Sequence, residues 1–221
     1  MVVLCRTLGS EGILGHFLKM DARLNRKEWE VHSIPISVAR NLVETYHYAH
    51  GASNTAVYLH GLFRKGEEKC YGVAWWLPPT KSAAQATYPK NWRGVLSLSR
   101  LAIRPETPKN ACTFLIGKSV KLIPANVWPC LVTYADLMQE HTGAIYRASN
   151  WTYIGLTKPQ QAFKIGNRLV AKKAGPHTRT NAEMESLGAV MIGTFAKHKF
   201  VIIREPRKPK VLENQWEFVY E

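Results

Sequence analysis

The stretch from Leu96 to Tyr153 limits the possible folds more than any other part of the 221-residue chain. Its first part, Leu96–Ile103, is an apolar run interrupted by polar residues, which predicts a strand. A polar turn then ends at Asn110, which we expect to cap a helix whose apolar residues recur at helical spacing. A second apolar run, Leu131–Tyr134, predicts a buried strand. The order strand, helix, strand is typical of a crossover unit in an α/β sheet.

Polar residues interrupt this unit where a sheet commonly carries a binding site. Asp136 follows the second strand at its carboxyl end, and open α/β sheets bind ligands at that edge. Ser99 and Arg100 interrupt the first strand. The alternative is an ordinary crossover in which Asp136 is solvated and Arg100 pairs with some carboxylate. Each residue alone fits either interpretation, but the combination favours a functional site.

The chain is strongly basic, with 30 Lys and Arg against 16 Asp and Glu and a net charge of +14. Such an excess on a small protein indicates a polyanionic partner. Residues 158–210 alone hold twelve Lys or Arg and three acidic residues. A solvated basic face is the alternative for any one cluster, whereas the whole distribution favours contact with nucleic acid. The residues expected to contact phosphates are Lys172, Lys173, Arg179, Arg207, Lys208 and Lys210.

The length suits one domain, residues 1–205, followed by a basic C-terminal tail, residues 206–221. The four cysteines are scattered without a CxxC pair or a His–Cys ligand spacing, which indicates reduced thiols and argues against a structural zinc site. No apolar run reaches the roughly 18 residues of a transmembrane helix, and the first residues lack the pattern of a signal peptide. We therefore expect a soluble protein that stays inside the cell and has no membrane partner.

The elements around the central unit complete an α/β layout. Helical periodicity predicts a helix from Ser37 to His47, and two strand-like runs, residues 55–63 and 69–77, predict a hairpin. We expect a loop over residues 81–95 and a last strand at Phe200–Ile203. This order matches the N-acetyltransferase-like (GNAT) layout, an α/β (α+β) single domain whose central mixed, mostly antiparallel sheet is flanked by helices.

Four motifs make the sequence resemble one known family. In chain order they are YHYAH (46–50), LSRLAIRPETPKN (98–110), LVTYAD (131–136) and HTGAIYRASNWTYIGLT (141–157). They resemble the Mom family of bacteriophage DNA-modification proteins, and the similarity covers about Val38 to Thr157 and extends more weakly to about Ile203. That family is regarded as GNAT-like and converts adenine in DNA to an N6-carbamoylmethyl derivative, which protects phage DNA from host restriction endonucleases.

The resemblance implies a set of catalytic residues. The family's His-Tyr pair, strand Arg, Asp and helix Tyr fall on His47, Tyr48, Arg100, Asp136 and Tyr146. His47 is the best candidate for a general base, because the unperturbed pKa of histidine is about 6.5. Tyr48 and Tyr146 are candidate acids or radical relays, and Arg100 is a candidate clamp for a carboxylate, carbonyl or phosphate. Asp136 is expected to orient His47 or to bind a metal.

The cofactors that the resemblance implies are acetyl-CoA, or a related acyl donor, and an iron centre. Acetyltransferases bind pyrophosphate with a Gly-rich loop, but residues 104–110 stand in its place and contain no glycine and two prolines without an N–H. The expected donor-binding residues are Ser99, Lys109 and Asn110. An iron site would use His47 and Asp136 with His50 or His141, although such histidines are more often surface residues.

The expected partner is double-stranded DNA, from which the target adenine must be flipped out of the stack. Stacking surfaces for the base are offered by the aromatic residues Trp75, Trp76, Trp92, Trp151 and Tyr153. Trp75 and Trp76 are equally explained as core residues of a strand. Asn150 is expected either to pair with the adenine edge or to cap a short helix.

Three functions remain open at this point. The first is a phage enzyme that modifies adenine N6 in DNA, as a monomer or homodimer in the cytoplasm of the bacterial host. The second is a GNAT acyltransferase for an amine on a protein or RNA, against which the missing Gly-rich loop argues. The third is a non-catalytic basic DNA-binding protein, against which the intact set of polar site residues argues.

Overall fold

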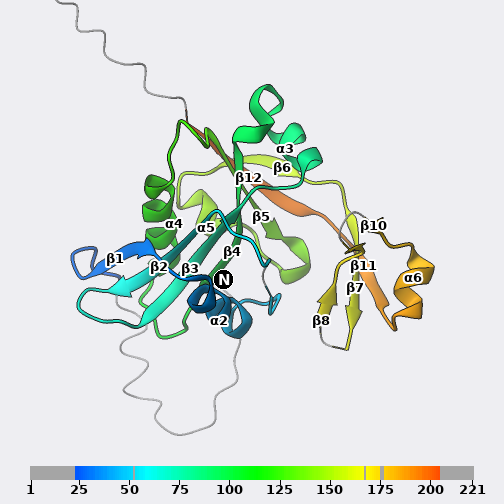
Figure 1. The fold of residues 1–221 in the computed structure, drawn as a ribbon, viewed down its shortest axis with the longest axis horizontal. Coiled ribbons are helices and arrows are strands. Elements are labelled where there is room, and N and C mark those ends of the chain that lie inside the picture. Colours follow the sequence, from blue (N-terminus) through cyan, green and yellow to red (C-terminus); the bar gives the residue numbers. More distant parts are fainter. Residues whose placement is uncertain (1–22, 52, 167, 175–176, 205–221) are drawn as a thin grey trace, which may run out of the picture.

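A seven-stranded sheet forms the centre of the molecule (Figure 1). The computed structural model describes residues 23–51, 53–166, 168–174 and 177–204. Along the sheet the strands are β1 (Trp29–Ser33), β2 (Tyr58–Arg64), β3 (Cys70–Leu77), β4 (Val95–Ile103), β5 (Cys130–Asp136), β12 (Lys197–Ile203) and β6 (Thr152–Leu156). Every neighbouring pair is antiparallel except β4 and β5, so the sheet is mixed and mostly antiparallel, as the sequence predicts.

Two helices bury apolar residues against opposite faces of this sheet. α2 (Ile36–Tyr46) contributes to one core, and α4 (Ala111–Leu122) contributes to the other. Trp75 and Trp76 are neighbours in β3, and they enter different cores because side chains alternate along a strand. Both rings are fully buried. They are therefore core residues and are not available for stacking on a base.

Helices fill the segment before β4, where the sequence analysis predicts a loop. α3 (Lys81–Thr87) begins after Thr80, whose hydroxyl accepts a hydrogen bond from the Ala83 N–H at 3.4 Å, and the 3-10 helix η1 (Pro89–Gly94) follows. A threonine cap and a run of alanines are ordinary helix signals, so the loop prediction is wrong for a local reason. Asn110 is the N-cap residue of α4, as predicted, but it has a φ of 70° and its side chain makes no capping hydrogen bond.

β4 and β5 pair along their first halves and then separate. In the described strands their parallel register ends where Leu98 lies opposite Thr133, although β4 continues to Ile103 and β5 to Asp136. At the same level Ser99 is the extra residue of an irregularity in the pairing of β3 with β4. Such a bulge bends a strand and interrupts its ladder. The carboxyl-terminal halves of the two strands therefore diverge beside the residues predicted for the site.

Residues 158–196 form a small separate unit between β6 and β12, which we call the inserted unit. Its elements are β7 (Gln160–Ile165), β8 (Arg168–Val170), β9 (Lys173–Ala174), β10 (His177–Thr178), α6 (Asn181–Ser186) and β11 (Val190–Phe195). It has its own buried cluster around Phe163 and Met184, and it stands to one side of the large sheet in Figure 1. From the sequence, only the basic character of this segment was expected.

Thr157 and Lys197 form the root of the inserted unit. The Thr157 N–H donates a hydrogen bond to the Lys197 carbonyl at 2.9 Å, and the Lys197 N–H donates one to the Thr157 hydroxyl at 3.0 Å. The chain thus leaves and rejoins the sheet at one point. The predicted basic tail, residues 206–221, lies outside the described residues. Among the described residues, no helix has the length and apolar character that a bilayer span requires.

Candidate active site

The five predicted catalytic residues come together where β4 and β5 diverge. His47 and Tyr48 follow the end of α2, Arg100 and Asp136 lie on the two strands, and Tyr146 lies on α5 (Ala144–Arg147). The Tyr48 hydroxyl lies close to the Asp136 carboxylate and within electrostatic reach of Arg100 and Tyr146. The positive charge of Arg100 also lies within electrostatic reach of His47. Four segments that are far apart in the sequence are thus joined in one polar cluster, which we call the strand-end cluster.

Asp136 is the most highly connected member of this cluster. It is 7% exposed, and its Oδ2 lies 2.9 Å from Lys197 Nζ. Its Oδ1 accepts a hydrogen bond from the Met138 N–H at 3.2 Å, and the carboxylate lies close to the Tyr48 hydroxyl. The sequence analysis missed Lys197, because a lysine in a basic region carries no local sign that its strand lies beside Asp136.

Tyr48 is held as a neutral phenol between two imidazoles. Burial, followed by the nearby charge of Asp136, raises the pKa of Tyr48 to about 12. The His47 ring stacks on it at a centroid distance of 4.4 Å, and the His141 ring approaches edge-on at 5.5 Å. At neutral pH the Tyr48 hydroxyl is therefore a hydrogen-bond donor, and release of its proton is strongly disfavoured.

His47 is also neutral, which is the form that the predicted general base requires, but its lowered pKa weakens it as a base. Burial is the main cause that lowers the pKa of His47 to about 3, and the positive charge of Arg100 adds to it. Its Nδ1 accepts a hydrogen bond from the Ala49 N–H at 3.1 Å, so the ring hydrogen is on Nε2. An imidazole with so low a pKa is a weak proton acceptor at neutral pH, and this geometry makes it a donor instead.

Arg100 connects the loop that follows α2 to β4 through hydrogen bonds. Its Nε donates to the Gly51 carbonyl at 3.0 Å, and its Nη1 donates to the Ser99 carbonyl at 2.8 Å. One planar guanidinium thus joins the bulge in β4 to the loop that carries His47 and Tyr48. Arg100 has a clear positioning role in addition to any contact with substrate.

Tyr146 lies on the side of the strand-end cluster that faces the hydrophobic core. It is 8% exposed, Thr133 lies beside its phenol, and burial raises the pKa of Tyr146. The Thr133 hydroxyl in turn donates to the Leu98 carbonyl at 3.2 Å, at the last paired position of β4 and β5. Thr133 is a second site residue that the sequence analysis missed, because it reads as an ordinary strand threonine.

The residues predicted to bind the base have different environments. Trp151 is 4% exposed and stacks on Trp76 at 6.3 Å, so its burial in the core removes it as a stacking surface. Tyr153 is 40% exposed, with the Arg147 guanidinium 5.1 Å from its ring centroid. Asn150 has a φ of 61° at the end of α5, and its side chain is exposed. Tyr153 and Asn150 therefore remain candidates.

The predicted phosphate contacts of the inserted unit also differ from one another. Lys172 Nζ donates hydrogen bonds to Gln161 at 3.2 Å and to Asn181 at 2.7 Å, which ties it to the unit's own packing. Arg179 Nη1 donates to the Ala171 carbonyl at 3.3 Å. Lys173 is exposed. Substitution of Lys173 should therefore change the charge of this surface with less effect on packing than substitution of Lys172 or Arg179.

The loop between β4 and α4 does not form the usual pyrophosphate cradle. The Arg104 N–H donates to the Tyr71 carbonyl, and the Thr107 N–H donates to the Arg104 carbonyl. The Glu106 carboxylate pairs with Lys69 at 3.0 Å and adds negative charge to the loop. These residues do not fit the pyrophosphate of an acyl-CoA in the manner of acetyltransferases. Binding of a donor by Ser99, Lys109 and Asn110 stays a prediction.

The strand-end cluster does not fit a metal ion as it stands. Both Asp136 oxygens and His47 Nδ1 already accept hydrogen bonds or pair with Lys197. Within the described parts of the chain, no group of three or more His, Cys, Asp or Glu side chains is arranged to hold a metal. An iron site on His47 and Asp136 stays a prediction.

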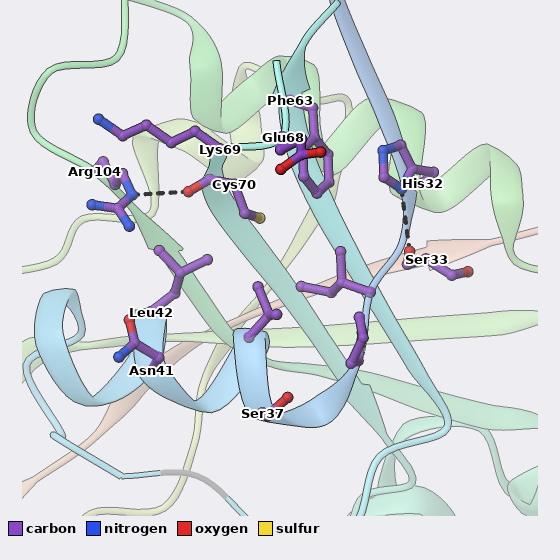
Figure 2. Close-up of a pocket in the computed structure, with 13 residues that line it drawn as sticks. His32, Ser33, Ser37, Asn41, Leu42, Phe63, Glu68, Lys69, Cys70 and Arg104 are labelled. Carbon is purple, nitrogen blue, oxygen red and sulfur yellow. Dashed lines mark hydrogen bonds between the residues drawn. The ribbon is translucent and has the colours of Figure 1, made fainter. Parts of the chain in front are cut away.

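A hollow of about 580 Å³ lies between α2, the end of β1 and the start of β3 (Figure 2). Apolar Leu42 and Phe63 line it together with the charged Lys69 and Arg104. Arg104 Nε donates to the Cys70 carbonyl at 2.8 Å, as Figure 2 shows. None of the predicted site residues lines this hollow, so it is a feature distinct from the strand-end cluster.

Solved structures with a similar fold are acetyltransferases. Ribosomal-protein-S5-alanine acetyltransferase from Vibrio fischeri has a TM-score of 0.50 at 11% identity, over 86% of this chain and 100% of that one. A putative acetyltransferase from Acinetobacter baylyi has a TM-score of 0.50 at 9% identity, over 82% of this chain and 96% of that one. At such low identity the likeness shows the fold alone, and it confirms the predicted GNAT-like α/β fold.

Proteins that are similar in sequence give more specific information about the family. The protein "Methylcarbamoylase mom" of Escherichia phage Mu is 31% identical over 137 residues, which are 58% of this chain and 54% of that protein. The match thus spans about half the length of the relative. The Mom protein family matches residues 28–215 of this chain, which include the strand-end cluster and the inserted unit. The chain therefore belongs to the Mom protein family.

Proposed function

We propose that the chain modifies adenine in phage DNA, placing a carbamoylmethyl group on N6 and so protecting the DNA from host restriction. Membership of the Mom family and the name of the phage Mu relative support this function. The observation that carries it is the strand-end cluster, in which His47, Tyr48, Arg100 and Asp136 meet at the diverging ends of β4 and β5. A protein that only binds DNA has no need of this set.

In the proposed reaction Asp136 takes the proton from the N6 amino group. Adenine N6 is a poor nucleophile because its lone pair is delocalised into the ring, so a carboxylate that accepts its proton assists its attack on the methylene carbon of a carbamoylmethyl donor. As the new N–C bond forms, the bond from that carbon to the donor's leaving group breaks, and the leaving group departs with the electron pair. Tyr48 and His47 are neutral donors, and we assign them hydrogen bonds to the carbonyl oxygen of the transferred group. Arg100 keeps their loop on β4. These assignments replace the general-base role predicted for His47.

The DNA substrate is bound by the basic inserted unit and presented to Asp136 at the root of that unit. Lys173 and its neighbours Lys172 and Arg179 contact phosphates, which position the duplex without reading sequence. The target adenine is flipped out, since its N6 is not accessible to the cluster inside the stack. Tyr153 is the exposed aromatic ring available for stacking on it. We expect the protein to act in the cytoplasm of the infected bacterium.

Nucleoside mass spectrometry of DNA from bacteria that express the chain tests the proposal. The wild-type protein should add a carbamoylmethyl mass to deoxyadenosine and make the DNA resistant to several unrelated endonucleases. Asp136→Asn, which keeps the shape of the side chain, should abolish the new nucleoside while leaving DNA binding in place. Unmodified deoxyadenosine from abundant, folded wild-type protein would contradict the proposal and favour a basic DNA-binding protein.

A further inference from the structure

The segment between β3 and β4 carries positive charge that no acidic residue balances. Residues 69–105 hold six Lys or Arg and no Asp or Glu. Three of these cations, Lys81, Lys90 and Arg93, lie on α3 and η1, and all three are exposed. Among the described residues, none of the three forms an ion pair with a carboxylate. Together with the ring of Trp92 they make up what we call the α3–η1 basic surface.

The ring of Trp92 holds two of these cations close together. Lys81 Nζ lies 5.5 Å from the centroid of the ring, and Arg93 Cζ lies 4.6 Å from the same centroid. The ring itself packs against a buried cluster, so the fold sets its position. Attraction to the ring restrains both cations, while the repulsion between them favours an anion that contacts both. Cations arranged in advance lose less conformational entropy when they bind a phosphate.

The α3–η1 basic surface lies on the same face of the sheet as Asp136. Val132, Tyr134 and Asp136 are alternate residues of β5, so their side chains share one face. Trp92 and Tyr134 both pack against the buried cluster that contains Val132. Thr87, the last residue of α3, lies beside the Tyr134 phenol. Two residues of a strand span about 7 Å, so the end of α3 lies about that far along β5 from the level of Asp136.

Two lysines of β12 continue the positive charge along this face. Lys199 and Lys197 are the direct partners of Tyr134 and Asp136 in the register of β12 and β5, so they lie on the same face as these residues. The Lys197 backbone is bonded to Thr157 at the root of the inserted unit. Basic residues therefore follow one face from α3 and η1, past Asp136, to the inserted unit, and α3 and that unit stand apart in Figure 1. A partner that contacts both must be an extended polyanion.

We propose that the α3–η1 basic surface is a second DNA contact, at which Lys81, Lys90 and Arg93 neutralise phosphates of the duplex that the inserted unit also binds. This inference rests on the proposed function, because that function makes DNA the extended polyanion. Contacts on both sides of Asp136 hold the duplex to either side of the target adenine while that base leaves the stack. Phosphate contacts of this kind add affinity and alignment without reading sequence.

The salt dependence of DNA binding tests this role. Affinity for a duplex of about 30 base pairs is measured at several salt concentrations, for wild type and for the double variant Lys81→Gln with Arg93→Gln. The double variant should bind more weakly and reduce the magnitude of the slope of log K against log salt by about 2. Circular dichroism checks that its fold is retained.

The matched control is Lys118→Gln with Lys121→Gln, which removes the same charge from exposed positions of α4 on the opposite face of the sheet. Lys118 also lies over an aromatic ring, 5.6 Å from the centroid of Phe114, so the control loses a similar contact. It should keep the wild-type slope. If the first double variant does not fold, Lys90→Glu is measured instead and should reduce the slope by about 1 or more.

The outcomes distinguish this surface from net charge and from the proposed function. A wild-type slope for the double variant would overturn the inference, as would an equal reduction in the α4 control. Modified adenine from the wild-type protein together with such a result would overturn this inference alone. Absence of DNA binding by the wild-type protein at low salt would contradict the proposed function, and the inference would fall with it.

Discussion

The Ser119 hydroxyl lies 2.6 Å from Nδ1 of His60, and this contact joins α4 to β2 inside the core. Trp76 Nε1 donates a hydrogen bond to the same hydroxyl at 2.7 Å. All three side chains are buried. One hydroxyl therefore satisfies two polar groups that the core would otherwise leave without partners.

Replacing Ser119 should destabilise the fold strongly for so small a change. Ser119→Ala leaves Trp76 Nε1 and His60 Nδ1 unpaired, and we expect the free energy of unfolding to fall by about 2–4 kcal/mol. Denaturant unfolding measures it. Ser37→Ala, at an exposed position of α2, is the control and should cost less than about 0.5 kcal/mol. Equal losses for the two variants would contradict the role of the hydroxyl.

The protein should lose stability as the pH falls through the weakly acidic range. Burial lowers the pKa of His60 to about 4, so the folded protein keeps this ring neutral where an unfolded chain protonates it. The resulting stability is complete above the unfolded pKa of about 6.5 and is lost as the pH falls toward the folded value. For His60 alone the free energy of unfolding should drop by about 3 kcal/mol between pH 7 and pH 4.

Unfolding of His60→Leu at the same pH values identifies the residue responsible. Its free energy of unfolding should depend less on pH than that of the wild type by a similar amount. His47, whose pKa burial lowers to about 3, should contribute a loss of the same sign and account for part of what remains. A pH dependence equal to that of the wild type would show that His60 is not the group that titrates.

Arg100→Lys should slow modification with little effect on folding. A lysine cannot hold the Gly51 and Ser99 carbonyls together, so the loop with His47 and Tyr48 loses its fixed position on β4. We expect the rate to fall about tenfold, because small displacements of catalytic groups are costly, while DNA affinity stays unchanged. Arg26→Lys, at an exposed position before β1, is the matched control and should retain the wild-type rate. Full activity of Arg100→Lys would contradict this role.

Binding of DNA should weaken steeply with salt. If about five phosphates are neutralised, the slope of log K against log salt is about −4 to −5. Lys173→Ala should weaken binding to all sequences alike and reduce the magnitude of this slope by about 1. Lys118→Ala, on α4, should leave the slope unchanged. A slope near zero for the wild-type protein would assign the charge of the inserted unit to another role.

Local patterns predicted the central part of the fold well. The alternation and spacing of apolar residues indicated β4, α4 and β5, and the position of Asp136 after a buried strand placed it at the site edge. The type and position of these elements follow from the periodicity of apolar residues and from turn residues, both of which can be read directly from the sequence. The convergence of His47 and Tyr48 with Asp136 came from the family resemblance and agrees with the geometry.

Features that depend on long-range contact were not accessible from the sequence. Lys197 is 61 residues from Asp136 and meets it only because β12 enters the sheet between β5 and β6. The polar residues around Trp151 in the sequence indicate an exposed side chain. In the structure, however, the turn after α5 places the Trp151 ring against the ring of Trp76. The neutral state of His47 follows from its burial, which no spacing rule gives. The contact of Lys197, the burial of Trp151 and the neutral state of His47 all depend on tertiary packing.

If the function is as proposed, the root of the inserted unit separates DNA recognition from the chemistry at Asp136. Its two ends, Thr157 and Lys197, are a single hydrogen-bonded pair, so excision of the segment between them leaves β6 and β12 as an ordinary hairpin of the sheet. A different segment spliced at the same pair would bring another polyanion to an unchanged Asp136. A modular attachment of this kind allows target preference to be exchanged in one step, without rebuilding the catalytic residues on β4 and β5.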